Sequence, residues 1–176
     1  MDVGANVGDI SRAAHAKGAI VHCIEPNPWA METLKQAVPE GHDVFIHDFA
    51  ASVLDGTQHL FFHENHEADP KRFSSGSSLI ASKPNVSRAG LTVPSRDLSR
   101  FLADLGQVDF LKIDIEGYEV ELVPHLVQTL DWELIGFVAV ETHDREKWPD
   151  LKDPTLLMKM SVEKAGLSDK FSWGWP

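Results

Sequence analysis

Cysteine, basic residues and long apolar runs are all scarce in this sequence. Its 176 residues include one cysteine, so no disulfide can form within the chain, and Cys23 is expected to be a buried free thiol. Sixteen basic against 27 acidic residues give a net charge of −11, which argues against nucleic-acid binding because that function needs a basic surface. Every apolar run is too short to cross a membrane, and we find no signal peptide. These absences predict a cytoplasmic protein that binds neither nucleic acid nor membrane.

The order of the apolar segments predicts the fold class. Hydrophobic residues make up 43% of the chain, which suits a single domain over residues 1–176. Short runs rich in branched residues are typical of buried strands, and helical patterns lie between most of them; the runs cover 19–24, 43–48, 108–113 and 134–140. This alternation predicts an α/β fold with a doubly wound, mostly parallel sheet. An Asp-Gly pair within 51–62 predicts an inserted hairpin, and aromatic residues at 171–175 predict a final strand.

The first residues predict a nucleoside-binding loop. Residues 1–9 have the pattern of a strand end that runs into a glycine loop and a helix, where Gly4 and Gly8 permit tight turns and close approach of a ligand. Glu25 ends the next strand about 20 residues after Gly4, the offset at which an acidic group reaches ribose hydroxyls in mononucleotide-binding units. Strand, loop, helix, strand and acid together therefore predict a nucleoside site.

The spacing of the glycines also discriminates among ligands. The dinucleotide fingerprint is G-x-G-x-x-G, whereas here Asn6 occupies the second glycine position and Asp2 precedes the first glycine. A bulky pyrophosphate is therefore less expected than a nucleoside with a cationic or amino-acid tail, because an aspartate near the loop suits an ammonium or a sulfonium. Asn27 and Pro28 are expected to cap and begin the following helix.

Charged residues interrupt the apolar stretch 108–119. Lys112, Asp114 and Glu116 recur at a spacing of two, which would place them on one face of a strand. Burying charges is costly unless they are paired or used, so the stretch has two interpretations. One is a structural salt bridge; the other, which we favour, is that the strand delivers carboxylates to a site at its C-terminal end. Gly117 would then let the chain turn into a helix with Glu119 in its first turn.

A long polar stretch, residues 64–96, is predicted to be a basic loop insertion. Between Pro70 and Arg96 there is no acidic residue, while five cations occur: Lys71, Arg72, Lys83, Arg88 and Arg96. Such a loop is either a solvated surface that happens to be basic or a cover for the site that contacts an anionic substrate. The nine histidines are scattered and predict no metal site. His143, at a strand end beside Glu141, is the one histidine with a candidate functional position.

Several of these segments together resemble the FkbM family of S-adenosylmethionine-dependent methyltransferases. The matching segments are 2–8, 25–28, the Asp55-Gly56 turn, 77–79, 97–98 and, most specifically, 111–119, and the similarity extends to about Gly166. The resemblance implies a class I, Rossmann-like methyltransferase fold with S-adenosylmethionine over the C-terminal ends of the first strands. It implies that the cofactor is bound by Gly4, Asn6 and Gly8 at its methionine end, by Glu25 at the ribose, by Asp48 near the adenine, and by Asp2 and Asn27 within the matching segments.

The resemblance also raises an expectation about the ends of the sheet. Members of the family normally have an apolar strand before the position of Asp2 and close the sheet with an antiparallel hairpin. We therefore expect a sheet that is truncated at both ends, and an exposed edge of this kind would favour a homodimer.

Methyl transfer from a sulfonium is an in-line displacement, which requires an aligned acceptor oxygen and removal of its proton. We predict Asp114 and Glu116 as the catalytic residues. We favour Asp114 as the base because it is expected to lie one step closer to the cofactor. The predicted reaction is O-methylation of a hydroxyl on a small molecule or sugar, anionic if the basic stretch contacts it, without a metal. Two alternatives remain: a catalytically silent relic that only binds cofactor, and a nicotinamide-dependent dehydrogenase, against which Asn6 counts.

Overall fold

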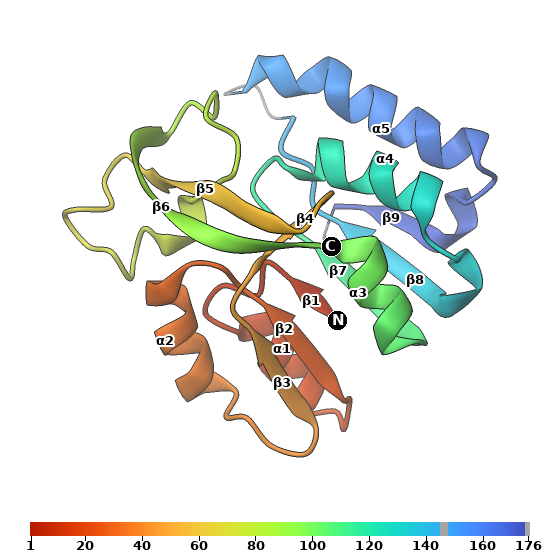
Figure 1. The fold of residues 1–176 in the computed structure, drawn as a ribbon, viewed down its shortest axis with the longest axis horizontal. Coiled ribbons are helices and arrows are strands. Elements are labelled where there is room, and N and C mark those ends of the chain that lie inside the picture. The colour runs from red at the N-terminus through yellow and green to blue at the C-terminus, as the bar shows by residue number, and fades with distance from the viewer. Residues whose placement is uncertain (145–147, 175–176) are drawn as a thin grey trace.

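The computed structural model describes residues 1–144 and 148–174, which form an open parallel sheet and a smaller second sheet (Figure 1). The main sheet has the strand order β3-β2-β1-β7-β8-β9. Its strands are β1 (Asp2–Val3), β2 (Val21–Ile24), β3 (Val44–His47), β7 (Val108–Ile113), β8 (Ile135–Val140) and β9 (Phe171–Trp173). Each pair of neighbouring strands runs parallel, so the predicted mostly parallel α/β sheet is confirmed.

Helices cover both faces of this sheet. They are α1 (Asp9–His15), α2 (Pro28–Ala37), α3 (Leu98–Leu105), α4 (Glu119–Thr129) and α5 (Lys152–Lys164). Ile24 packs in one core cluster with residues of α3, α4 and α5, whereas its neighbour Cys23 packs in a second cluster with α1 and α2. Successive strand residues point to opposite faces, so the two clusters lie on opposite sides of the sheet. The fold is therefore doubly wound, as predicted.

Two helices begin at side-chain caps, of which the sequence predicts the first. The Asn27 side chain accepts a hydrogen bond of 3.0 Å from the backbone N–H of Trp29 at the start of α2. The Asp97 carboxylate accepts one of 3.0 Å from the backbone N–H of Ser99 at the start of α3. Such caps satisfy backbone donors that a helix leaves unpaired, so they fix where each helix begins.

The predicted hairpin over 51–62 is wrong. β4 (Ala50–Ser52) and β5 (Gly56–His63) do not pair with each other, because β6 (Val86–Asp97) lies between them, parallel to β4 and antiparallel to β5. The Asp55 carboxylate accepts hydrogen bonds from the backbone N–H of Asp97 and from Arg100, which attaches the Asp-Gly turn to the end of β6. The predicted loop over 64–96 is correspondingly shorter and ends at residue 85, just before β6 begins at Val86.

The last predicted strand is present in part. β9 pairs with β8 in parallel from Phe171 to Trp173, whereas Trp175 lies outside the described residues. Within residues 1–144 and 148–174, no pair of strands in the main sheet runs antiparallel. In the same part of the chain, none of the helices combines the length and the apolar character that a membrane crossing requires.

Two histidines on β2 and β3 are expected to make stability depend on pH. The Nδ1 atom of His22 lies 3.1 Å from Nε2 of His47, and burial, together with His47 and the N-terminal ammonium, lowers the pKa of His22 to about 4. The unfolded chain takes up this proton near pH 6.5, so it binds more protons than the folded chain between about pH 6.5 and 4. Thermal denaturation should therefore show stability falling as the pH drops through this range.

A variant pair isolates this contribution from other titrating groups. His22→Gln should flatten the pH dependence of Tm between pH 7 and pH 5, whereas His15→Gln, at an exposed position on α1, should leave it unchanged. Equal slopes in the wild type and His22→Gln would show that the histidine pair does not govern acid stability.

Candidate active site

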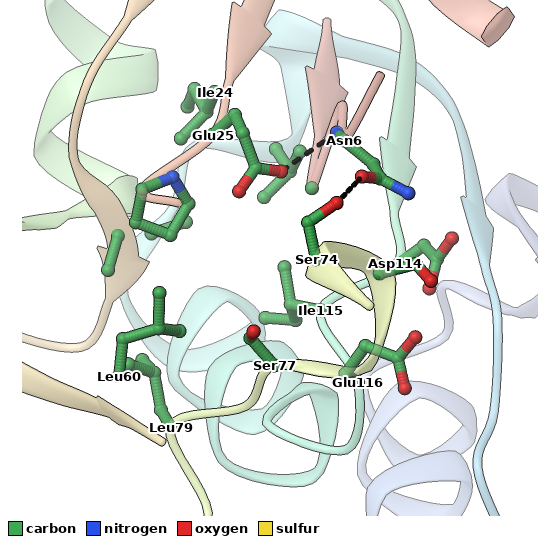
Figure 2. Close-up of a pocket in the computed structure, with 16 residues that line it drawn as sticks. Asn6, Ile24, Glu25, Leu60, Ser74, Ser77, Leu79, Asp114, Ile115 and Glu116 are labelled. Carbon is green, nitrogen blue, oxygen red and sulfur yellow. Dashed lines mark hydrogen bonds between the residues drawn. The ribbon is translucent and has the colours of Figure 1, made fainter. Parts of the chain in front are cut away.

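A cavity of about 150 Å³ lies at the C-terminal ends of β1, β2 and β7. Five of the nine predicted site residues line it: Gly4, Asn6, Glu25, Asp114 and Glu116. Figure 2 shows the side chains of Asn6, Glu25, Asp114 and Glu116 around this space. The C-terminal edge of an open parallel sheet is where such folds bind ligands, so the cavity is the candidate site.

The glycine loop brings β1 and β7 into contact. Gly4 has a φ of +76°, and a Cβ atom at this position would lie 1.8 Å from the carbonyl oxygen of Asp114. Only glycine permits this approach, which places the loop directly beside the end of β7. Gly8 serves packing instead, because a Cβ there would lie 2.7 Å from the side chain of Leu34 on α2, and Gly8 does not line the cavity.

Glu25 is a buried acid whose carboxylate faces the cavity (Figure 2). It accepts hydrogen bonds of 2.8 Å from the backbone N–H groups of Asn6 and Asn27, one on each oxygen. Burial raises the pKa of Glu25 to about 7, although these two hydrogen bonds act in the opposite direction. Each carboxylate oxygen can accept a second hydrogen bond, so Glu25 can bind two hydroxyl groups of a ligand.

Asp2 is buried but does not line the cavity. Its Oδ1 atom lies 3.0 Å from the Nζ atom of Lys112, and its Oδ2 atom accepts a hydrogen bond of 2.6 Å from the hydroxyl of Ser11. Lys112 also donates to the carbonyl of Gly4 and lies 3.5 Å from Oδ2 of Asp114. Asp2 therefore acts as the counterion of Lys112, which in turn fixes the glycine loop and Asp114.

Two further predicted cofactor residues also lie outside the cavity lining. Asn27 is buried at the start of α2 and bonds to the serine-rich segment that follows β5. Asp48 follows β3 at an exposed position and is not brought together with the other candidates. The cavity wall near β4 and β5 is apolar instead, formed by Ala50, Leu60 and Leu79.

Asp114 and Glu116 lie just beyond β7, which ends at Ile113. The predicted strand alternation therefore does not extend to Glu116, whose φ of +57° belongs to the turn that Gly117 continues. Burial raises the pKa of Asp114 to about 6, while Lys112 acts in the opposite direction. A carboxylate with a pKa near neutrality, next to a ligand cavity, is suited to act as a general base.

His143 lies within a group of three carboxylates. Its Nε2 atom is 3.7 Å from Asp114 and 3.6 Å from Glu116, and its Nδ1 atom is 3.3 Å from Glu119. Burial opposes a charge on His143, but the carboxylates outweigh it and raise its pKa. The sequence predicts a functional position for His143 because it follows a buried strand, and in the structure it lies shortly after the end of β8.

Asp114, Glu119 and His143 are also the residues that could approach a metal ion, since one ligand atom from each lies within 4.8 Å of the others. The two Glu119 oxygens, however, already accept the backbone N–H groups of Ile115 and Gly117. The raised pKa of His143 also favours its cationic form, which cannot bind a metal. We therefore interpret the group as an ion-pair network that holds the turn after β7.

The segment between β5 and β6 contributes cavity-lining residues that the sequence does not predict, although a cover for the site is one of the two interpretations of this stretch. Ser74, Ser75, Ser77 and Leu79 line the cavity from above the strand ends. The family resemblance includes residues 77–79, but it does not show that they lie at the cavity. The sequence cannot show this either, because the cavity brings together residues that are far apart in the chain. Of the five cations in the basic stretch, none lines the cavity within the described residues. The side-chain ammonium of Lys83 does bond to a residue that lines it, Glu116.

An open parallel sheet with a glycine loop after β1, a buried acid after β2 and carboxylates after β7 defines a Rossmann-like methyltransferase fold. The chain belongs to the FkbM methyltransferase family, because the model of the methyltransferase FkbM domain matches residues 2–159. Comparison with curated proteins and comparison with solved structures both find no match. The family assignment rests on that one long match, which spans all five of the cavity-lining candidates.

Proposed function

We propose that the protein is an S-adenosylmethionine-dependent O-methyltransferase that acts on a hydroxyl group of a small molecule or sugar. One observation carries the proposal: the residues that we propose to bind the nucleoside and the carboxylates that we propose to meet the acceptor line the same cavity. Membership of a methyltransferase family supports it. When bound, the cofactor supplies an electrophilic methyl group on a sulfonium.

The residues around the cavity suit such a cofactor. Glu25 has one free acceptor position on each carboxylate oxygen for the two ribose hydroxyls. The apolar wall of Ala50, Leu60 and Leu79 is suited to contact the adenine. This wall, and not Asp48, is therefore the proposed adenine contact. Gly4 and Asn6 lie next to Asp114, so a ligand tail that follows this loop reaches the carboxylates.

Asp114 is the proposed base. Lys112 holds one carboxylate oxygen and His143 lies near the other, so the side chain is fixed at the edge of the cavity. With a pKa near 6, Asp114 is mostly ionised at neutral pH and can take the proton of an acceptor hydroxyl. Glu116 lies on the same side and is proposed to orient that hydroxyl.

The experiment that tests this function compares two cofactors and then searches for an acceptor. S-adenosylmethionine should raise Tm while NAD leaves it unchanged, and incubation with a panel of hydroxyl compounds should release S-adenosylhomocysteine. Stabilisation by NAD alone would favour a dehydrogenase. Binding of S-adenosylmethionine with no turnover on any acceptor would favour the catalytically silent relic.

The charge of the acceptor is a separate part of the proposal. Lys71 and Arg72 come just before the short 3₁₀ helix η1 (Ser74–Gly76) that borders the cavity, although Lys71 also pairs with Glu32 at 3.1 Å. For an anionic acceptor, KM should rise with ionic strength and rise further in Lys71→Glu/Arg72→Glu, because exposed charges are screened by salt. Lys152→Glu/Lys164→Glu makes the same charge change on α5 and should have no such effect.

A further inference from the structure

Residues 69–85, which we call the strap, cross the cavity between β5 and β6. The Ser74 hydroxyl lies 3.2 Å from Oδ1 of Asn6 in the glycine loop, as Figure 2 shows, and shares its one proton between this oxygen and the carbonyl oxygen of Lys71 at 2.9 Å. The Asn27 side-chain amide donates one of 3.1 Å to the Ser77 hydroxyl. The strap is therefore attached to both loops that form the nucleoside side of the cavity.

The other half of the strap is attached to Glu116. Lys83 donates hydrogen bonds of 2.6 Å to the Glu116 carboxylate and 2.8 Å to the carbonyl oxygen of Gly76. The Ser78 hydroxyl donates one of 2.8 Å to the backbone carbonyl of Glu116. Glu116 is thus held by the strap at its backbone and at its side chain.

Burial distinguishes Lys83 from the other cation of the strap that forms an ion pair. The side chain of Lys83 is 5% exposed, whereas those of Lys71 and its partner Glu32 are both more than half exposed. An exposed pair adds little stability, but a buried ammonium without its carboxylate is strongly unfavourable. The closed position of the strap therefore depends on Glu116 far more than on Lys71.

The closed strap leaves little room beneath it. The cavity of about 150 Å³ is smaller than the range of about 300–1,000 Å³ that is usual for small-molecule sites. Because Ser74, Ser75 and Ser77 form part of its wall, outward movement of the strap would enlarge it. A ligand of nucleoside size would require that movement.

We propose that the strap is a lid over the methyltransferase site, latched by the ion pair between Lys83 and Glu116. Lys83 is then a positioning residue, which holds the Glu116 carboxylate while the lid is closed over the empty cavity and releases it when a ligand enters. The acceptor-side carboxylate would thereby also control access to the cavity. The existence of the latch rests on the contacts above, and its role in catalysis rests on the function proposed for the site.

Hydrogen exchange of the intact protein without ligand tests the latch. Lys83→Met and Glu116→Gln should each speed exchange at least tenfold at the amide of Ser78, which bonds to the carbonyl of Phe61, and at neighbouring strap amides. The double variant should exchange no faster than Lys83→Met alone, because Lys83→Met already removes the ion pair with Glu116. Lys83→Arg should restore slow exchange, and Lys71→Met, the matched control in the same segment, should have no effect.

Stopped-flow association of S-adenosylhomocysteine tests the lid. If opening limits access, Lys83→Met should associate at least fivefold faster than the wild type. Unchanged exchange in Lys83→Met, additive effects in the double variant, or an unchanged association rate would overturn the proposal. Failure of the wild type to bind S-adenosylhomocysteine would overturn the proposed function instead, and the exchange data would still decide whether the latch exists.

Discussion

Replacing Glu25 with alanine is expected to weaken the binding of S-adenosylhomocysteine by about 10²- to 10⁴-fold. The carboxylate is proposed to accept two ribose hydroxyls, and a hydrogen bond to a charged group contributes about 1.5–3 kcal/mol. Isothermal titration calorimetry measures the loss directly. Asp48→Ala is the matched control, because Asp48 also follows a strand of the main sheet but does not line the cavity, and it should leave the affinity unchanged.

The pH dependence of binding provides a second measure of the same interaction. Burial raises the pKa of Glu25 to about 7, so below that pH a ligand that needs the ionised carboxylate must displace a proton. The wild-type Kd should therefore rise by about tenfold for each pH unit below 7. Glu25→Ala should lack this dependence. Wild-type affinity in Glu25→Ala, or parallel pH profiles for the two proteins, would contradict the ribose assignment.

Replacing Asp114 with asparagine should reduce the rate of methyl transfer by about 10²-fold or more, as expected for loss of a general base. The change is nearly isosteric, so Tm and the affinity for S-adenosylhomocysteine should stay close to those of the wild type. Turnover can be followed by release of S-adenosylhomocysteine with any acceptor found in the panel. Asp109→Asn, at an exposed position on the same strand, controls for loss of a charge from β7.

Two other results would assign Asp114 a structural role. If Asp114→Asn unfolds at a much lower temperature, the ion pair with Lys112 serves stability more than chemistry. If the variant turns over normally, the carboxylate does not take the proton. Glu116→Gln then becomes the variant to examine for loss of the base.

Much of the fold could be predicted because its signals are local. The branched runs of β2, β7 and β8 and the cap at Asn27 each lie within a few residues of the element they specify. The place of β6 between β4 and β5 could not be predicted in this way. That pairing joins strands separated by residues 64–85, and the Asp-Gly turn gave a local signal for a different hairpin.

The candidate site likewise contains residues that local signals predict and contacts that they do not predict. Gly4, Glu25 and Asp114 were found because strand ends of a parallel sheet meet at one edge. Asp2 was expected near a cation of the ligand, but the structure pairs it with Lys112 of the protein. Lys83 was expected to be either exposed to solvent or in contact with an anionic substrate, but it is buried against Glu116, 33 residues away. Which charge a buried ion pairs with depends on tertiary contacts that no spacing encodes.

A structure with S-adenosylhomocysteine bound is the sharpest test of the proposed site. We predict that the ribose hydroxyls bond to Glu25, that the adenine lies against the wall of Ala50, Leu60 and Leu79, and that the sulfur faces Asp114. We also predict that the strap has moved away from Asn6. Ligand bound elsewhere on the protein, or bound in this cavity with its sulfur directed away from Asp114 and Glu116, would contradict the proposed site.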